Sequence, residues 1–150
     1  MNQLARAQPL LRNQFKVFKS ISTRWMDNDC YGHVNNVVYY SWFDTAVNSY
    51  LIEEGVLDPN AGSTIGLVVS SSCNYFDPIS YPQPVDVGIA VTRIGRSSVE
   101  YRIGIFAQDS VQSSAWGKFV HVYVSPLTRK PVDQLPDTFK LSLENIYVPV

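Results

Sequence analysis

The sequence holds few of the residues on which several classes of protein depend. It has two cysteines and two histidines in 150 residues, and only 17% of its residues are charged. Two cysteines are too few for a disulfide framework, so we expect reduced thiols in a cytosolic protein. No apolar run reaches the length of a membrane span, and the first 20 residues lack the apolar core of a signal peptide. We therefore expect a cytoplasmic protein with no membrane partner.

The charge balance also excludes a class of partner. The net charge is −1, so we expect no nucleic acid to bind. The distribution is uneven, because residues 27–58 hold six acidic residues and no Lys or Arg, whereas residues 93–130 hold six basic and two acidic residues. The basic stretch is either an ordinary solvated strand surface or a site for a phosphorylated ligand. Its basic residues are Arg93, Arg96, Arg102, Lys118, Arg129 and Lys130.

The sequence is rich in apolar residues, which make up 45% of the chain, and in aromatic residues, which make up 13%. This composition predicts a single globular domain rich in β-sheet over residues 1–150. We expect a flexible arm at 1–12 and a C-terminal tail at 136–150, with either a short helix or no regular structure over residues 135–145. A strand-like alternation begins at Phe15, and short links rich in Pro, Gly or Asp favour antiparallel neighbours. The further strands are predicted near residues 66–76, 85–94, 97–107 and 114–125.

One helix is predicted from about Asn36 to Glu54. Asn35 or Asn36 is a suitable N-cap, and Gly55 is a suitable residue to end the helix. Because Trp42 lies opposite the main apolar stripe, we expect the helix to be covered on more than one side. One helix among several antiparallel strands predicts an α+β fold. The stripe consists of Tyr39, Phe43, Ala46, Val47, Tyr50 and Leu51.

The segment that leads into this helix carries two carboxylates and an imidazole within seven residues, at Asp27, Asp29 and His33. A carboxylate beside aromatic side chains can act as a base or nucleophile. The free N–H groups of the first helical turn, near Asn36, would polarise a carbonyl oxygen and stabilise an oxyanion. Helix capping alone would also select Asp and Asn here, so the residues by themselves leave both interpretations open.

Other chemistries fit the sequence less well. Cys30 and His33 could form a nucleophilic pair, but a cysteine so placed is more typical of a small buried filler. Asp27, Asp29 and His33 could bind a metal, yet the second histidine, His121, lies in a predicted strand. The sequence contains no Gly-rich phosphate loop, Gly-x-Ser-x-Gly elbow or zinc-finger spacing. We therefore expect neither a metal nor a cofactor.

The segment from Asp27 to Tyr39 reads Asp-x-Asp-x-x-Gly-His-Val-Asn-Asn-x-x-Tyr. It resembles the signature of the 4-hydroxybenzoyl-CoA thioesterase-like branch of the hotdog superfamily. The resemblance covers roughly residues 14 to 136. Further matching elements, in order, are Asp77-Pro78, Pro84-x-Asp86, Gly95-Arg96-Ser97-Ser98 and the Thr128-Arg-Lys-Pro-Val segment.

The resemblance implies a hotdog fold, in which a five-stranded antiparallel sheet wraps around one long central helix. It implies an acyl-CoA thioesterase, which hydrolyses an acyl-CoA thioester to a free acid and coenzyme A. Coenzyme A is then part of the substrate and not a cofactor. Such proteins are homo-oligomers, either dimers or tetramers, and their active sites are shared between subunits.

The resemblance also implies roles for individual residues. Asp29 attacks the thioester carbonyl or activates the water that does so, while Asp27 supports the loop. The backbone N–H of Asn36 binds the thioester oxygen, and His33 orients groups or adjusts the ionisation of Asp29. The 96–98 turn corresponds to a segment that contacts the phosphates or pantetheine arm. The implied substrate-binding residues are Gly32, Tyr39, Arg96, Ser97 and Ser98.

Two other functions remain open at this stage. A hotdog hydratase or dehydratase would also act on acyl thioesters, with Asp29 and His33 as an acid–base pair. A non-catalytic acyl-CoA-binding protein would need neither carboxylate. The aromatic residues Tyr75, Phe76 and Tyr81 could line an acyl pocket or could simply cover the sheet surface.

Overall fold

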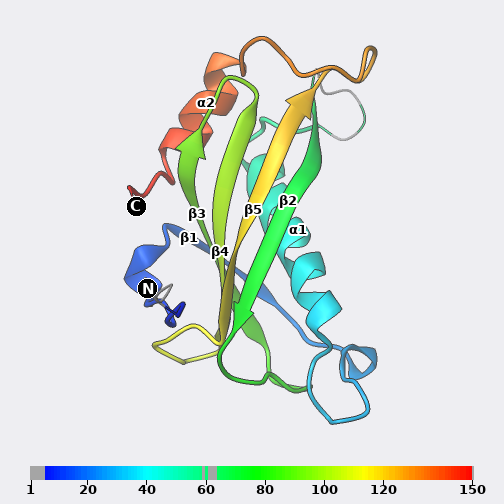
Figure 1. Cartoon of the computed structure of the whole chain (residues 1–150), viewed down its shortest axis with the longest axis vertical. Coiled ribbons are helices and arrows are strands. Elements are labelled where there is room, and N and C mark those ends of the chain that lie inside the picture. Colours follow the sequence, from blue (N-terminus) through cyan, green and yellow to red (C-terminus); the bar gives the residue numbers. More distant parts are fainter. Residues whose placement is uncertain (1–5, 59, 61–63, 150) are drawn as a thin grey trace, which may run out of the picture.

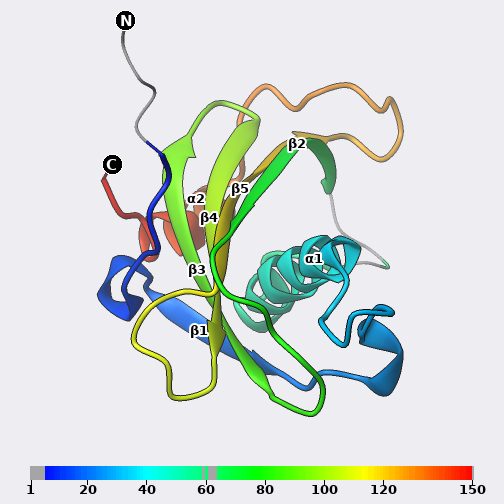
Figure 2. The ribbon, with the colours of Figure 1, turned by 60° about the horizontal axis from the view of Figure 1, so that its bottom comes forward.

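The computed structural model describes residues 6–58, 60 and 64–149. Five antiparallel strands form one sheet in the order β1-β3-β4-β5-β2, and the sheet curls around the long helix α1 (Figures 1 and 2). This architecture confirms the α+β fold with one central helix. The elements are β1 (Val17–Ile21), α1 (Asn36–Glu53), β2 (Ile65–Tyr75), β3 (Val85–Ile94), β4 (Ser98–Ala107), β5 (Ala115–Val124) and α2 (Asp137–Glu144).

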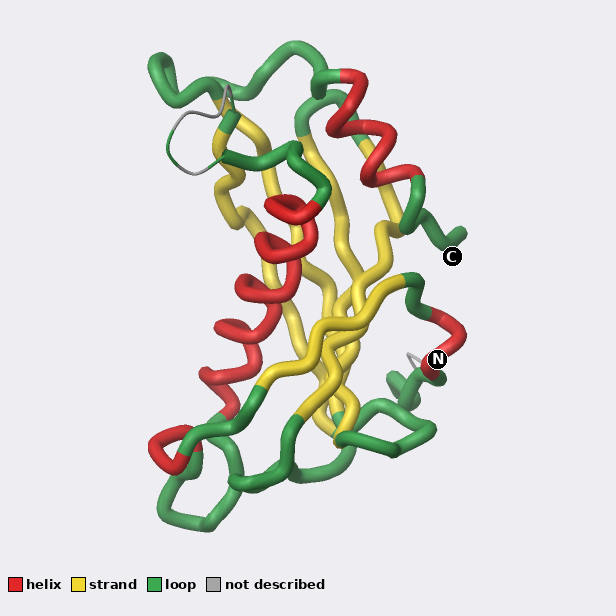
Figure 3. Tube along the Cα trace, turned by 180° about the vertical axis from the view of Figure 1, so that it is seen from behind, coloured by secondary structure: helices red, strands yellow, loops and turns green. Residues whose placement is uncertain are grey.

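Helix α1 forms where capping and apolar spacing predict it. The side chain of Asn35 accepts a hydrogen bond from the Val37 N–H at 3.1 Å, and Gly55 follows the helix with a positive φ of 72°. Every residue of the predicted stripe is buried, and Trp42 on the other side is also only 4% exposed. The helix is thus covered on two sides, as expected, and Figure 3 shows it lying along the sheet. Its N-terminus is held in one place relative to the strands.

The link between β2 and β3, residues 76–84, does not join neighbouring strands. β2 pairs with β5 at one edge, while β3 lies between β1 and β4. The expectation that short links join antiparallel neighbours holds for β3–β4 and β4–β5 but is wrong for this link. Instead, the link crosses the end of the sheet, and its residue Ile79 is buried. The Ile79 carbonyl accepts a hydrogen bond from the Val34 N–H at 2.7 Å. The link therefore packs directly under the start of α1.

The N-terminal segment differs from the expected flexible arm. Residues 1–5 lie outside the described residues, but Leu10 exchanges two hydrogen bonds with Ser113, at 2.8 and 2.9 Å. The Gln8 carbonyl accepts the indole N–H of Trp116 at 2.7 Å. A polar backbone lying on a sheet needs such partners, and residues 8–12 find them on β5 and on the loop before it.

The expected C-terminal tail contains a packed helix over most of its described length. Phe139 and Leu143 of α2 are buried, and the Phe139 ring lies 4.7 Å from that of Tyr123. The Tyr50 hydroxyl donates to the Ser142 carbonyl at 2.7 Å, which ties α2 to α1. Helix α2 thus closes the end of the core that lies away from the start of α1 (Figure 1).

Candidate active site

The two carboxylates of the 24–36 loop have different surroundings. Asp27 is 1% exposed, and its oxygens accept hydrogen bonds from the Arg24 backbone N–H at 2.7 Å and the Arg24 guanidinium at 2.8 and 3.0 Å. The Asp27 carbonyl accepts the Asn35 N–H at 2.8 Å. Asp27 therefore holds together the two ends of the loop and has no oxygen open to a substrate.

Asp29 is half-buried and only partly engaged. Its Oδ1 accepts the Tyr31 N–H at 2.8 Å and the His33 N–H at 3.4 Å. Its Oδ2 accepts no hydrogen bond from the residues that the structure describes. The tight turn needs Gly32, whose φ of 80° is costly for other residues. The loop thus orients Asp29 through one oxygen and leaves the other available for chemistry.

The start of α1 supplies an unused donor. The Asn36 N–H belongs to the first helical turn, where no intrahelical acceptor exists, and no described residue accepts it. The Tyr75 hydroxyl donates to the Asn36 carbonyl at 3.3 Å, so the end of β2 is tied to the start of the helix. The positive end of the helix dipole lies at the same place, so the electrostatic potential beside this N–H favours a group with partial negative charge.

A hollow of about 310 Å³ opens beside these groups. The rings of Tyr39 and Tyr75 meet edge to face at 5.0 Å in its wall. Burial raises the pKa of Tyr39 to about 12, so its hydroxyl is neutral at physiological pH. Asp29 does not line the hollow, but its backbone N–H donates to the His33 carbonyl at 2.8 Å. The hollow is lined by His33, Val34, Asn36, Tyr39, Tyr75, Phe76, Asp77 and Pro78.

The structure groups some of the predicted site residues and separates others. His33, Asn36 and Tyr39 line one hollow, and Gly32 and Asp29 lie in the adjoining loop. The 96–98 turn lies at the opposite end of the sheet. In the sheet, Ile105 of β4 pairs with Ala115, which pairs with Tyr75 beside the hollow, and Ser98 lies seven residues before Ile105 along β4. Seven residues of strand span about 23 Å. A single protomer therefore does not bring Arg96, Ser97 and Ser98 to the Asp29 loop.

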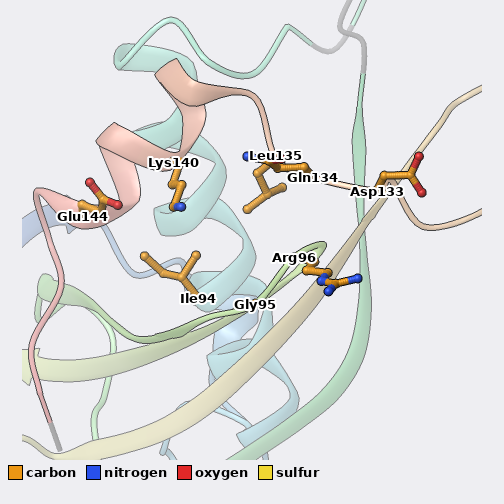
Figure 4. Close-up of a pocket in the computed structure, with 8 residues that line it drawn as sticks. All are labelled: Ile94, Gly95, Arg96, Asp133, Gln134, Leu135, Lys140 and Glu144. Atoms are coloured by element: carbon orange, nitrogen blue, oxygen red, sulfur yellow. The ribbon is translucent and has the colours of Figure 1, made fainter.

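Arg96 instead lines a hollow of about 680 Å³ between the β3–β4 turn and α2. Figure 4 shows the Arg96 side chain extending away from Lys140 and Glu144 of α2, on the side of the hollow that carries Asp133. The Arg96 carbonyl accepts the Leu135 N–H at 3.1 Å, which fixes the turn. Lys140 and Asp133 were not expected here, because only the three-dimensional fold places them beside this turn.

Cys30 differs from its sequence-based expectation. Cys30 is exposed, so its interpretation as a buried filler is wrong, because the loop turns outward at this residue. Cys73 is half-buried behind Tyr75, and burial raises its pKa to about 11. A thiol that stays protonated at neutral pH is a weak nucleophile. Both cysteines are free.

Tyr75 and Phe76, for which two interpretations were open, do line the hollow, whereas Tyr81 packs against Trp25 at 5.9 Å. Val34 and Asp77 also line it and were not predicted as site residues. The Asp77-Pro78 turn was the available signal, since it begins the link that crosses under α1. Among the described residues, no cluster of three His, Cys, Asp or Glu side chains is placed to hold a metal ion. In the same part of the chain, neither helix combines the length and apolarity needed to cross a bilayer.

The sequence model of the thioesterase superfamily matches residues 31–114, and the chain belongs to this superfamily. The match begins two residues after Asp29. A curated relative, the YsmA protein of Bacillus subtilis, is 25% identical over 88 residues, and the chain spans 59% of that protein's length.

Solved structures agree with this assignment and with the hotdog fold. The PA5185 protein of Pseudomonas aeruginosa is 49% identical, with a TM-score of 0.90 over 93% of this chain and 97% of that chain. A 1,4-dihydroxy-2-naphthoyl-CoA thioesterase from Synechocystis has a TM-score of 0.75 at 20% identity, over 84% of this chain and 93% of that one. A DHNA-CoA thioesterase from Staphylococcus aureus has a TM-score of 0.73 at 25% identity, over 85% and 86%.

Proposed function

We propose that this protein is an acyl-CoA thioesterase, which hydrolyses an acyl-CoA thioester to a free acid and coenzyme A. The observation that carries the proposal is a half-buried carboxylate, Asp29, with one unengaged oxygen, next to a hollow whose rim holds the unused N–H of Asn36. The similar structures that are named as 1,4-dihydroxy-2-naphthoyl-CoA and DHNA-CoA thioesterases support it. The two free cysteines agree with a reducing, cytoplasmic location.

In the proposed reaction, each of these groups has its own role. The thioester carbonyl oxygen accepts the Asn36 N–H, and the helix terminus stabilises the oxyanion that develops there. If Asp29 is a general base, it takes a proton from the attacking water, the C–S bond breaks, and that proton passes to the departing thiolate. If Asp29 is the nucleophile, its attack on the carbonyl carbon breaks the C–S bond first. Water then cleaves the acyl–Asp bond, and the proton it releases converts the thiolate of coenzyme A to the thiol. His33 supports this step from the rim, Gly32 allows the tight turn that carries Asp29, and Tyr39 lines the hollow that receives the acyl group.

The test of this function is the release of free thiol from a panel of short, long and aromatic acyl-CoAs. We expect thiol release from at least one class of acyl group. With crotonyl-CoA, a thioesterase releases thiol, whereas a hydratase consumes the double bond and leaves the thioester intact. Hydration without thiol release would replace the proposed function by the hydratase alternative. No reaction with any thioester would support an acyl-CoA-binding role.

We also propose that the protein is a homo-oligomer, either a dimer or a tetramer, and that β2 forms its first interface. β2 lies at the edge of the sheet, and its residues Leu67, Val68 and Val69 are 41%, 48% and 59% exposed. An unpaired apolar edge is a template for a further strand. An antiparallel β2–β2 pair would set the partner's 65–67 end beside Tyr75. Because Leu67 pairs with Val122, which pairs with Ser98, the partner's 96–98 turn would approach the Asp29 loop.

Val69→Lys should break this interface, because a charge on the strand edge opposes pairing. We expect the molar mass in solution, measured by sedimentation equilibrium, to fall to that of one chain, with loss of thioester hydrolysis. The control is Val111→Lys, a loop residue that is 74% exposed, which should leave the mass unchanged. An unchanged oligomer in Val69→Lys would exclude β2 as the interface.

A further inference from the structure

The outer face of the sheet is turned away from α1 and toward the viewer in Figure 1. It carries a further hollow. Its volume is about 420 Å³, which is within the range of small-molecule sites. It lies across β3, β4 and β5, on the opposite face from the Asp29 loop. We call it the outer-face hollow, and its lining residues are Thr92, Arg93, Glu100, Arg102, Trp116 and Lys118.

The strand register brings three of the six residues of the basic stretch to this hollow. Arg102 of β4 lies directly opposite Lys118 of β5, and like charges in that position repel each other. Arg93 lies on β3 directly opposite Glu100 of β4, where the register shifts between Val91 and Arg93. The shift inserts Thr92 as an extra residue, so Thr92 and Arg93, neighbours in the chain, both face the hollow. The fold thus gathers cations that the chain keeps apart.

Little in the protein neutralises these cations. The single carboxylate in the lining, Glu100, accepts the Thr92 hydroxyl at 2.8 Å, and the lining as a whole keeps two positive charges, from three cations and one anion. In the part of the chain that the structure describes, Arg93, Arg102 and Lys118 form no ion pair within 4.0 Å. An excess of cations over carboxylates at the wall of a hollow favours the binding of an anion.

Arg102 strengthens this preference. It is half-buried and donates to the Gln14 carbonyl at 3.4 Å, and the rest of its five N–H groups have no acceptor among the described residues. Burial lowers the pKa of Arg102, while the nearby Glu100 opposes this effect. A phosphate group accepts paired N–H bonds from a guanidinium, so it would satisfy donors that the protein leaves open.

Trp116 provides the other recognition element. Its indole N–H is bound to the Gln8 carbonyl at 2.7 Å, which fixes the ring at the wall of the hollow. A fixed indole beside cations suits a ligand that combines a flat ring with phosphate, because the ring can stack while the phosphates meet the cations.

We propose that the outer-face hollow binds an adenine nucleotide, its phosphates held by Arg93, Arg102 and Lys118 and its ring by Trp116. Two sources carry this chemistry: a free nucleotide, or the 3′-phosphorylated ADP end of coenzyme A. The hollow and the Asp29 loop lie on opposite faces of the sheet, so binding does not depend on the chemistry of Asp29. A free nucleotide would act as an effector, whereas the end of coenzyme A would make the hollow part of substrate binding.

The test is calorimetric titration of the full chain with ATP, ADP, adenosine 3′,5′-bisphosphate, coenzyme A and inorganic phosphate. Lys118→Gln and Arg93→Gln remove exposed cations from the hollow, and Lys130→Gln, in an exposed loop, is the matched control. We expect nucleotide affinity to fall by at least about tenfold in both hollow variants and to stay unchanged in the control. Trp116→Leu should weaken the binding of nucleotides and leave the binding of inorganic phosphate unchanged.

The pattern across ligands identifies the source. Binding of coenzyme A and the 3′,5′-bisphosphate, but not ATP, would assign the hollow to the substrate's nucleotide end. Binding of ATP or ADP that coenzyme A does not displace would assign it to a free nucleotide. The proposal is overturned if no nucleotide binds, or if Lys118→Gln and Lys130→Gln bind with equal affinity.

Discussion

Asp27→Ala should lower the free energy of unfolding by about 3 kcal/mol, because it removes a buried acceptor of three hydrogen bonds. For a chain of 150 residues, this corresponds to a fall in melting temperature of about 6–12 °C. The Arg24 N–H would lose its acceptor, and the turn at residues 25–27 would lose its closure. Urea unfolding followed by circular dichroism, at equal protein concentrations, measures the change.

Asp133→Ala provides the control for this prediction. Asp133 is exposed and lies far from the loop, so its replacement should change the unfolding free energy by no more than about 0.5 kcal/mol. If Asp27→Ala were as stable as this control, then Asp27 would not anchor the loop, and the division of roles between the two aspartates would have to be revised.

The local parts of the fold follow from the sequence. The predicted helix at 36–54 and the four predicted strands agree with α1 and β2–β5 to within one residue at each end. Capping by Asn35, the stop at Gly55 and the apolar periodicity are properties of a few adjacent residues, so a single sequence shows them.

The parts of the fold that depend on contacts between distant segments of the chain could not be predicted from the sequence. Local patterns do not specify the order of strands in the sheet, so the crossing of residues 76–84 under α1 was not predicted. For the same reason, residues 8–12 were expected to be flexible, although their hydrogen-bond partners lie about 100 residues away in the chain. Repulsion between Arg102 and Lys118 is likewise visible only once β4 and β5 are in register.

The part of the candidate site that is contiguous in the chain could be predicted, whereas the part that comes from distant segments could be predicted only incompletely. The loop and helix start are contiguous, so Asp29, His33, Asn36 and Tyr39 could be named together. Asp77 reaches the hollow from the end of another strand and was not predicted, whereas Tyr75 and Phe76 were named as possible wall residues. The 96–98 turn was placed at the site by resemblance, and in one protomer seven residues of β4, about 23 Å of strand, lie between Ser98 and the end of the sheet that carries the site.

Asp29→Asn should abolish most thioester hydrolysis without disturbing the fold. The amide oxygen of Asn can still accept the Tyr31 and His33 N–H groups, so the loop keeps its hydrogen bonds. What is lost is the negative charge and the basic or nucleophilic oxygen. General-base catalysis by a positioned group contributes about 10²–10⁴-fold to rate, so we expect a loss of that size in kcat.

The contrast between the two aspartates makes this prediction specific. If Asp29 only capped the helix, its replacement would lower the stability of the protein, and the remaining activity would follow the fraction of protein that is folded. Asp29→Asn should instead retain the melting temperature of the parent protein, whereas Asp27→Ala should lower it. A stable protein that lacks activity identifies Asp29 with the chemistry.

The most direct measurement is kcat for thiol release by the parent protein and by Asp29→Asn, on the best acyl-CoA of the panel, with both melting temperatures recorded. We predict a fall in kcat of at least about 100-fold at an unchanged melting temperature. Rates that agree within about threefold would contradict the account and would exclude Asp29 as the base or nucleophile.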